Sequence, residues 1–300
     1  MKYIISLDGG GTKSEAVAYD LEGNVISQGY SGFSNLLINE KDGINHIIEA
    51  IEKCLGTLSK ENCLFLFIGI AGIGGVKDRS PLEKALNDAF QIPFKIVNDA
   101  QIAHAAMLNG QSGVLTIAGT GSICIGMHKE HTITAGGWGH LLGDEGSGYW
   151  ICMEVFKKIT QEFDEGIPLS YLSLKMLERL QLKEADGLKK YIYHNIKAEI
   201  ASHVPFIVEM ANLGDLMALT VLERAGQHLG KTTIHAIKKL SLREELRVAI
   251  KGSILQRIPV VQKTFIQTIH EQYPTILFYT EDVSSTFGGY LLAMKELNNY

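Results

Sequence analysis

The sequence predicts an α/β protein made of two domains that share one order of elements. Short apolar runs typical of strands alternate with longer segments in which apolar residues recur at helical spacing. A strand, a Gly/Thr turn and a second strand open the chain, and the same order begins again near residue 114. A chain of 300 residues also exceeds what one small hydrophobic core usually organises, which favours two domains.

The first half predicts a three-stranded meander followed by alternating helices and strands. The expected strands are 3–8, 16–19, 25–30, 63–70 and 94–97. The expected helices are 44–55, a segment that starts near Pro81, and the small-residue segment 100–106. The polar pair Asn98 and Asp99 therefore stands between the last strand and the last helix of this half.

The second half predicts the same order with a long helical region inserted. Its expected strands are 114–117, 123–127, 132–135, 246–250 and 276–279. Helices are expected from 150 to about 240, over 259–273, and again after 282–286. Ser241 to Glu244 has the form of a capping box. The two halves thus repeat an architecture without repeating its letters.

Composition excludes several classes of protein. Lys and Arg total 28 against 33 Asp and Glu, and no basic run indicates a nucleic acid or membrane-surface partner. Apolar runs such as 63–70 are far shorter than the roughly 20 residues of a spanning helix. The N-terminus shows no signal-peptide pattern, and the four cysteines lack zinc-site spacing. We expect a cytoplasmic protein with reduced thiols.

Two glycine-rich turns are candidates for binding phosphate. Glycine lets backbone approach a ligand closely, and backbone N–H groups in such turns bind anions. The first turn consists of Asp8, Gly9, Gly10, Gly11 and Thr12, and the second of Gly119, Thr120, Gly121 and Ser122. Asp8 could hold Mg²⁺ through water, because Mg²⁺ keeps several waters in proteins. Each turn is also compatible with an ordinary hairpin, but their equivalent places in the two halves favour function.

Three further stretches carry candidate site residues. Asp99 follows a strand, where open α/β sheets bind ligands, and could act as a general base, although its local sequence favours a helix N-cap. Six glycines crowd between Gly136 and Trp150, which predicts a loop over a sugar, with Trp138 and Asp144 as contacts. Packing of Trp138 and a turn role for Asp144 are the alternatives. Gly252 and Ser253 follow a strand, and the next helix could meet a nucleotide there, although an ordinary strand–turn–helix junction has the same local sequence.

The motifs taken together resemble the N-acetylglucosamine kinase group of the BadF/BadG/BcrA/BcrD-type ATPases. They occur in the family's order over almost the whole chain, although the helical region 155–240 adds little. The motif at 136–150 is the most specific of them. The motifs are LDGGGTKSEAVAYD, GFSNLL, VNDAQIAHAA, LTIAGTGS, GGWGHLLGDEGSGYW, IKGSI and TFGGYLLA.

This resemblance implies two ribonuclease-H-like domains of the actin and hexokinase superfold, with ATP and Mg²⁺ in a cleft between them. It places the first domain at 1–112 together with a C-terminal helix at about 286–300, and the second, with a helical insertion, at 113–285. It implies that Asp99 is the catalytic base rather than a cap. It assigns the two glycine turns to phosphate, the Gly252 motif to adenosine, and Asn35, Trp138 and Asp144 to the sugar.

The implied reaction is ATP-dependent phosphorylation of an amino sugar, with N-acetylglucosamine, at its 6-hydroxyl, as the first choice. Glucosamine and N-acetylmuramic acid remain alternatives, and so does an ATPase or nucleotide-binding regulator of the same fold. A homodimer is a possible state, because such kinases are commonly dimeric. Another branch of the family ligates an iron–sulfur cluster through cysteines, and a group of hexosamine kinases carries a Cys-rich zinc motif. Cys54, Cys63, Cys124 and Cys152 match neither pattern.

Overall fold

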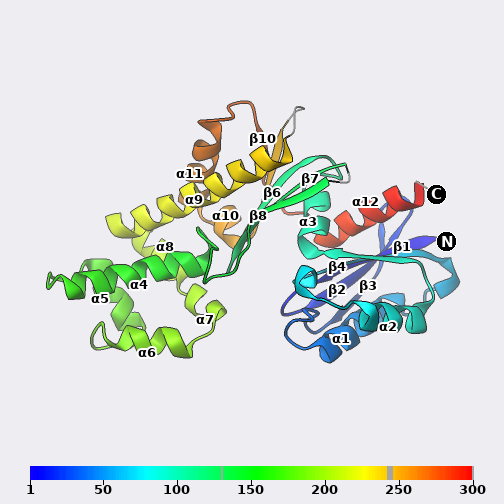
Figure 1. Ribbon diagram of the computed structural model, residues 1–300, viewed down its shortest axis with the longest axis horizontal. Coiled ribbons are helices and arrows are strands. Elements are labelled where there is room, and N and C mark those ends of the chain that lie inside the picture. The colour runs from blue at the N-terminus through cyan, green and yellow to red at the C-terminus, as the bar shows by residue number, and fades with distance from the viewer. Residues whose placement is uncertain (130, 242–245, 299–300) are drawn as a thin grey trace. The chain divides into compact units, whose positions relative to one another are not determined.

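The computed structural model describes residues 1–129, 131–241 and 246–298 (Figure 1). The chain divides into two compact units, here called unit 1 (Met1–Ser112 and Glu281–Tyr300) and unit 2 (Gly113–Thr280). Most of the predicted capping box at Ser241 to Glu244 lies outside the described residues, as do the last two residues of the C-terminal segment. Within the described ranges, no helix combines the length and the apolar character needed to cross a bilayer.

Unit 1 is a five-stranded sheet with helices on both faces. The strand order is β3-β2-β1-β4-β5, in which the meander is antiparallel and β4 and β5 run parallel to β1. The strands are β1 (Tyr3–Gly9), β2 (Ser14–Asp20), β3 (Val25–Ser31), β4 (Cys63–Ile70) and β5 (Phe94–Asn98). The helices are α1 (Glu40–Leu55), α2 (Ser80–Phe90), α3 (Asp99–Met107) and α12 (Ser285–Asn298), with short 3₁₀ turns at Lys60–Asn62 and Ile73–Gly75.

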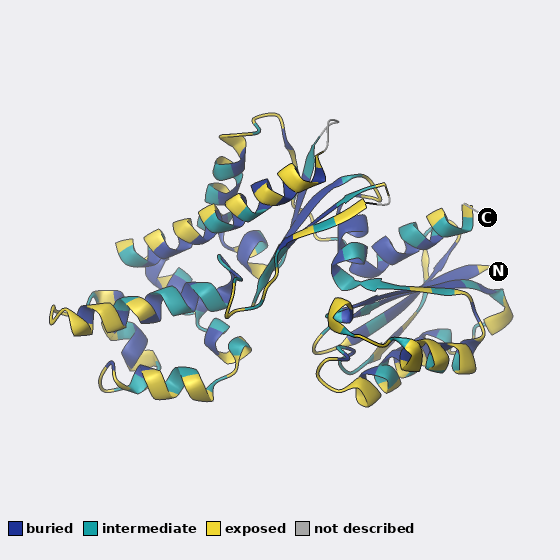
Figure 2. Ribbon diagram, viewed as in Figure 1, coloured by how far each residue is buried: buried dark blue, intermediate teal, exposed yellow. Residues whose placement is uncertain are grey.

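Strand β1 shows why this sheet is covered on both faces. Tyr3, Ile5 and Leu7 pack into one core with α1 and α2, whereas Ile4 packs into a second core with α3 and α12. Side chains alternate between the two faces of a strand, so a strand buried on both faces is apolar at successive positions. Strands β1, β2 and β4 are mostly buried, whereas the outer faces of α1 and α2 are exposed (Figure 2).

Helix α12 packs directly on α3 because its sequence contains glycine at the contact. A Cβ atom built at Gly288 would lie 1.8 Å from the carbonyl oxygen of Ile102, which backbone packing does not permit. The small residues predicted at both helices therefore set the distance between them, and a segment from the end of the chain supports the helix that begins at Asp99.

Unit 2 has the same sheet topology, with the order β10-β9-β6-β7-β8. The strands are β6 (Gly113–Ala118), β7 (Ser122–His128), β8 (His131–Gly136), β9 (Arg247–Lys251) and β10 (Leu277–Tyr279). The helices are α4 (Gly148–Asp164), α5 (Tyr171–Arg179), α6 (Gly187–His194), α7 (Lys197–Ala201), α8 (Val204–Asn212), α9 (Leu216–Leu240), α10 (Ser253–Arg257) and α11 (Pro259–His270). The repeat of architecture predicted from the sequence is thereby confirmed at the level of strand order.

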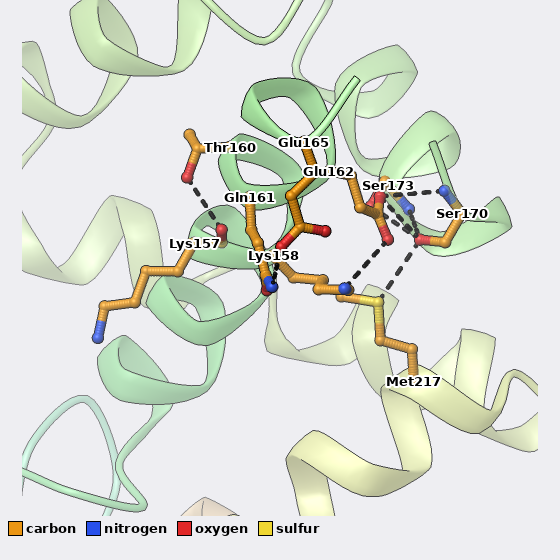
Figure 3. A network of polar contacts seen from close by, with 9 residues as sticks. All are labelled: Lys157, Lys158, Thr160, Gln161, Glu162, Glu165, Ser170, Ser173 and Met217. Atoms are coloured by element: carbon orange, nitrogen blue, oxygen red, sulfur yellow. Dashed lines mark hydrogen bonds and ion pairs between the residues drawn. The ribbon is translucent and has the colours of Figure 1, made fainter. Parts of the chain in front are cut away.

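The helical region expected from 150 to about 240 consists of six helices, α4 to α9. Helix α9 packs on the sheet and on α11, and α4 to α8 continue the same apolar core away from the sheet (Figure 1). A polar network fixes the connection between α4 and α5 (Figure 3). The buried carboxylate of Glu162 accepts hydrogen bonds from the Ser170 backbone N–H at 3.0 Å and from its hydroxyl at 3.3 Å, with Lys158 Nζ at 3.8 Å.

Candidate active site

The first glycine turn joins β1 to β2 and is anchored by two neighbouring loops. The Gly10 N–H donates to the Lys13 carbonyl at 2.9 Å, which closes the turn. The Ser34 N–H donates to the Gly10 carbonyl at 2.9 Å, and the Ala71 N–H donates to the Gly9 carbonyl at 2.8 Å. The turn therefore lies at the carboxyl end of β1, held by the loops after β3 and β4.

Gly9 and Gly11 of this turn lie in different surroundings, one crowded and one open. A Cβ atom at Gly9 would lie 2.2 Å from Ser34 Oγ, so close packing alone excludes a side chain there. A Cβ atom at Gly11 would meet nothing within 4 Å, and Gly11 has no positive φ. Packing and backbone geometry therefore explain Gly9 but not Gly11. Open space at an exposed glycine of a turn is what a phosphate group would need to approach backbone N–H groups.

Asp99 is the first residue of α3, and its local interpretation as a helix N-cap is wrong. The cap is Asn98, whose side chain accepts a hydrogen bond from the Ala100 N–H at 3.0 Å. Gln101 completes a capping box by accepting from the Asn98 N–H at 3.1 Å. Asp99 Oδ1 also accepts from the Ala100 N–H, at 2.9 Å. Since Asn98 already caps the helix, the Asp99 carboxylate is not needed for that purpose.

The electrostatics of Asp99 suit proton transfer. Burial, and to a smaller extent the negative charge of Asp8, raise its pKa from 3.8 to about 6. The two residues meet because β1, β4 and β5 are parallel: Asp8 pairs with Gly69, and Ile70 pairs with Asn98, at one edge of the sheet. A carboxylate with a pKa near neutrality that lies where substrates bind is typical of a general base.

The residues at this edge also fit a magnesium ion held loosely. No cluster of three or more His, Cys, Asp or Glu side chains exists among the residues that the structure describes. Mg²⁺ is usually bound through one or two carboxylates, waters and the phosphates of its ligand rather than by a protein cage. Asp8, partly buried beside the first glycine turn, is a donor of that kind.

Asn35 lies at the same edge of unit 1. Its Oδ1 accepts from the Leu37 N–H at 3.0 Å. The Asn35 side chain packs against Gly72, just beyond β4, where a Cβ atom would lie 3.0 Å from this Oδ1. The neighbouring Ser34 is the residue that anchors the first glycine turn. The structure therefore brings Asp8, Asp99 and Asn35 together from three separate stretches of the sequence.

In unit 2, the second glycine turn and the Gly252 motif line one cavity. Strands β6 and β9 are parallel neighbours that pair Ile117 with Lys251, so the two motifs follow adjacent strand ends. The cavity has a volume of about 430 Å³. Its lining residues are Gly119, Thr120, Gly148, Ala198, Ala201, Ser202, Val204, Pro205, Val208, Ser253, Ile254, Arg257 and Ile258.

The glycines of this cavity show the same contrast as those of the first turn. Gly252 has φ 96° and a Cβ atom there would lie 2.3 Å from the Ala118 carbonyl oxygen, so the fold itself requires glycine. A Cβ atom at Gly119 would meet nothing within 4 Å, and Gly119 has no positive φ. Gly119 therefore leaves open space beside the cavity, as Gly11 does at the first turn.

One wall of the cavity comes from α7 and α8, in the helical region that adds little to the family resemblance. Ala198, Ala201, Val204, Pro205 and Val208 supply an apolar surface. Such a surface, with a few polar groups at its border, suits the flat face of a purine base. No pattern in the sequence predicted this wall, because small and β-branched residues on a short helix are equally typical of ordinary packing.

The loop at 136–148 is rich in glycine largely because its backbone adopts a conformation that favours glycine at several positions. Gly136, Gly137, Gly139 and Gly146 all have positive φ. The tip of the loop exposes three large apolar side chains: Trp138 is 73% exposed, Leu141 84% and Leu142 79%. Trp138 is therefore available to a ligand, whereas His140 packs edge-on against Tyr149 with ring centroids 4.8 Å apart.

Asp144 lies apart from this exposed tip, against the second glycine turn. It is 3% exposed. Its Oδ1 accepts from the Ser122 N–H at 3.3 Å, and its Oδ2 lies 2.5 Å from Lys197 Nζ on α7. The sequence identified Asp144 but not its partner, because nothing in the sequence around Lys197 marks it as part of a site.

With this geometry in view, similarity to known proteins identifies the family. The sequence model of the BadF/BadG/BcrA/BcrD ATPase family matches residues 5–288. The chain belongs to this family. An N-acetylmuramic acid/N-acetylglucosamine kinase of Clostridium acetobutylicum is 32% identical, over 99% of both chains. An N-acetyl-D-glucosamine kinase of Dictyostelium discoideum is 29% identical, over 97% of both chains.

A solved structure supports the same fold for this BadF/BadG/BcrA/BcrD-type chain. A proposed N-acetylglucosamine kinase from Chromobacterium violaceum superposes with a TM-score of 0.75 at 20% identity, covering 97% of this chain and 98% of that one. The prediction of two ribonuclease-H-like domains of the actin and hexokinase superfold is confirmed. The resemblance stated from the motifs is confirmed as well.

Proposed function

We propose that this protein is an ATP-dependent kinase that phosphorylates N-acetylglucosamine at its 6-hydroxyl. The observation that carries the proposal is the pair of carboxylates at one edge of the unit 1 sheet, in which Asp99 has a pKa near 6. A kinase of sugars needs such a base to accept the proton of the attacking hydroxyl. Membership of the family and full-length similarity to two amino-sugar kinases support the same reaction.

In this proposal Asp99 accepts the proton from the sugar hydroxyl as its oxygen bonds to the γ-phosphorus of ATP. The bond from that phosphorus to the oxygen bridging the β- and γ-phosphates breaks, and ADP leaves. Asn35, Trp138 and Asp144 bind the sugar. The backbone N–H groups of Gly9–Thr12 and Gly119–Ser122 bind phosphate oxygens, and the Gly252–Ser253 segment lies at the adenosine. Mg²⁺, near Asp8, would neutralise charge on the phosphates.

N-acetylmuramic acid is the second sugar to consider. The Clostridium acetobutylicum relative carries both sugars in its name and matches over nearly the whole chain. N-acetylmuramic acid differs from N-acetylglucosamine by an acidic ether group on C3, so acceptance depends on the space and charge around that position. The cytoplasmic location and the homodimer expected from the sequence stay predictions.

The test is an assay of ADP release with ATP and Mg²⁺ against N-acetylglucosamine, N-acetylmuramic acid, glucosamine and glucose. Mass spectrometry and nuclear magnetic resonance of the product would establish the monophosphate and the position of the phosphate. We expect release only with N-acetylated amino sugars, and phosphate on the 6-hydroxyl. ADP release that is the same with and without every sugar would contradict the kinase and favour an ATPase of the same fold.

A further inference from the structure

A lysine from the helical region of unit 2 lies at the second glycine turn. Lys197 is the first residue of α7, and its Nζ lies 2.5 Å from Asp144 Oδ2. The ion pair is partly withdrawn from solvent, with the Asp144 side chain 4% exposed and the Lys197 side chain 28% exposed. Because Asp144 Oδ1 accepts from the Ser122 N–H at 3.3 Å, the carboxylate links Lys197 to the turn.

The ammonium group lies directly on the turn. A Cβ atom at Gly121 would lie 2.6 Å from Lys197 Nζ and 2.9 Å from Asp144 Oδ2. Glycine at position 121 therefore makes room for this ion pair. The next residue along α7, Ala198, lines the cavity together with Gly119 and Thr120. Lys197 is thus placed where the polar turn meets the apolar wall.

Charge explains why a cation is needed at that place. A nucleotide triphosphate brings several negative charges, and the buried carboxylate of Asp144 would repel them if it had no counterion. Among the residues that line the cavity, Arg257 alone carries a formal charge. An ammonium group has three N–H donors, and the contact with Asp144 uses one of them. The others can donate to phosphate oxygens, which form strong charge-assisted hydrogen bonds.

We propose that Lys197 binds the phosphate chain of the nucleotide and that Asp144 holds its ammonium group at the second glycine turn. The inference rests on the proposed kinase function, to which it adds a residue from the helical region. It is compatible with a contact between Asp144 and the sugar, because a carboxylate has about four acceptor positions. Lys197 also neutralises Asp144, so the turn can accept phosphate beside a buried acid.

The experiment compares the binding of ATP, ADP and adenosine to the purified full-length protein by isothermal titration calorimetry, without sugar. The variants are Lys197→Gln and Lys197→Arg. The control is Lys175→Gln, which makes the same change of residue type at an exposed ion pair with Glu178, 2.7 Å long, on α5. We expect Lys197→Gln to weaken ATP and ADP by about 10- to 100-fold, with adenosine changed less than about twofold. Lys197→Arg should retain part of the affinity, and Lys175→Gln should match the wild type.

The outcomes separate this inference from the proposed function. Wild-type protein that binds no ATP would overturn both. Wild-type protein that binds ATP, with Lys197→Gln unchanged or with adenosine weakened as much as ATP, would overturn the inference alone. Should Lys197→Gln fail to fold because Asp144 is left without a counterion, the neutral pair Asp144→Asn with Lys197→Gln avoids that buried charge. That double variant should still lose affinity for ATP relative to Asp144→Asn, and equal affinities would contradict the inference.

Discussion

The two glycine turns occupy equivalent places in two sheets of the same topology, yet the charged side chains around them differ. The first turn begins at Asp8 and lies near Asp99, whose pKa is raised to about 6 by burial and by the negative charge of Asp8. The second lies beside Asp144, whose charge is compensated by Lys197. One half of the repeat therefore favours accepting a proton, whereas the other favours holding an anion.

The glycines of the two units also differ in whether packing requires them. In the first turn, a side chain at Gly9 would meet Ser34, and in unit 2 a side chain at Gly252, which follows β9, would meet Ala118. Gly11 in the first turn and Gly119 in the second face open space with no positive φ. Each unit therefore has one glycine that packing requires and one that neither packing nor backbone conformation requires.

The largest effect is expected from Asp99→Asn. Asparagine has nearly the same shape but accepts no proton at neutral pH, so we expect kcat to fall by about 10³-fold or more. Binding of ATP should change less than about twofold in calorimetry, because the proposed phosphate contacts are made by the backbone N–H groups of the two glycine turns and not by Asp99. The melting temperature should not fall, because the substitution removes a partly buried charge. Near-normal turnover would show that Asp99 is not the base.

The next effect is expected from Gly119→Val, which sharpens the distinction between the two kinds of glycine. Its side chain would enter open space, so the melting temperature should stay within a few degrees of the wild type. Affinity for ATP should fall by about 10- to 100-fold, because the added methyl groups occupy the space proposed for phosphate. Gly252→Val is the contrasting variant: it should unfold or aggregate, since its Cβ meets backbone. Normal ATP affinity in Gly119→Val would remove that glycine from the site.

A pH profile tests the electrostatics of the first turn. Because Asp99 must be deprotonated to act as a base, kcat/KM should decline about tenfold per pH unit below the pKa of about 6. The folded pKa is raised above its value of 3.8, so protonated Asp99 contributes stability at low pH. This contribution is lost as the pH rises through about 6.

The control for the pH profile is Asp99→Asn. Its residual activity should lack the decline, and denaturant titrations should show that wild-type stability falls relative to the variant between pH 4 and pH 7. An activity profile that is flat down to pH 5 in the wild type would contradict the raised pKa.

The smallest effect is expected from Trp138→Ala. Since the side chain is 73% exposed, its loss should leave the melting temperature within about one degree of the wild type. If the indole packs on the sugar, KM for N-acetylglucosamine should rise by about 3- to 30-fold while KM for ATP stays constant. Leu142→Ala, at the same loop tip, is the matched control for exposed apolar area. An unchanged sugar KM would separate Trp138 from the proposed sugar site.

Some features of the fold and the site could be predicted from the sequence, and others could not. The order of strands and helices along each half and the positions of the glycine turns follow from local periodicity and turn chemistry, and the structure has them where they were predicted. The role of Asp99 as a helix cap was the wrong local prediction, because two neighbouring residues can both cap and only the folded backbone shows that Asn98 does. The apolar wall of α7 and α8 was not predicted, since no local pattern distinguishes a cavity wall from a packed helix face.

The sequence by itself determined the two repeated halves, the two phosphate-type turns and the family to which their motifs point. These depend on spacing along the chain, which a sequence states directly. Only the tertiary structure decided which groups share a site: Asp8 with Asp99, Gly119 with Ser253, and Asp144 with Lys197. Electrostatic interaction and burial depend on distances through space, and residues far apart along the chain acquire those distances only when strands and helices pack.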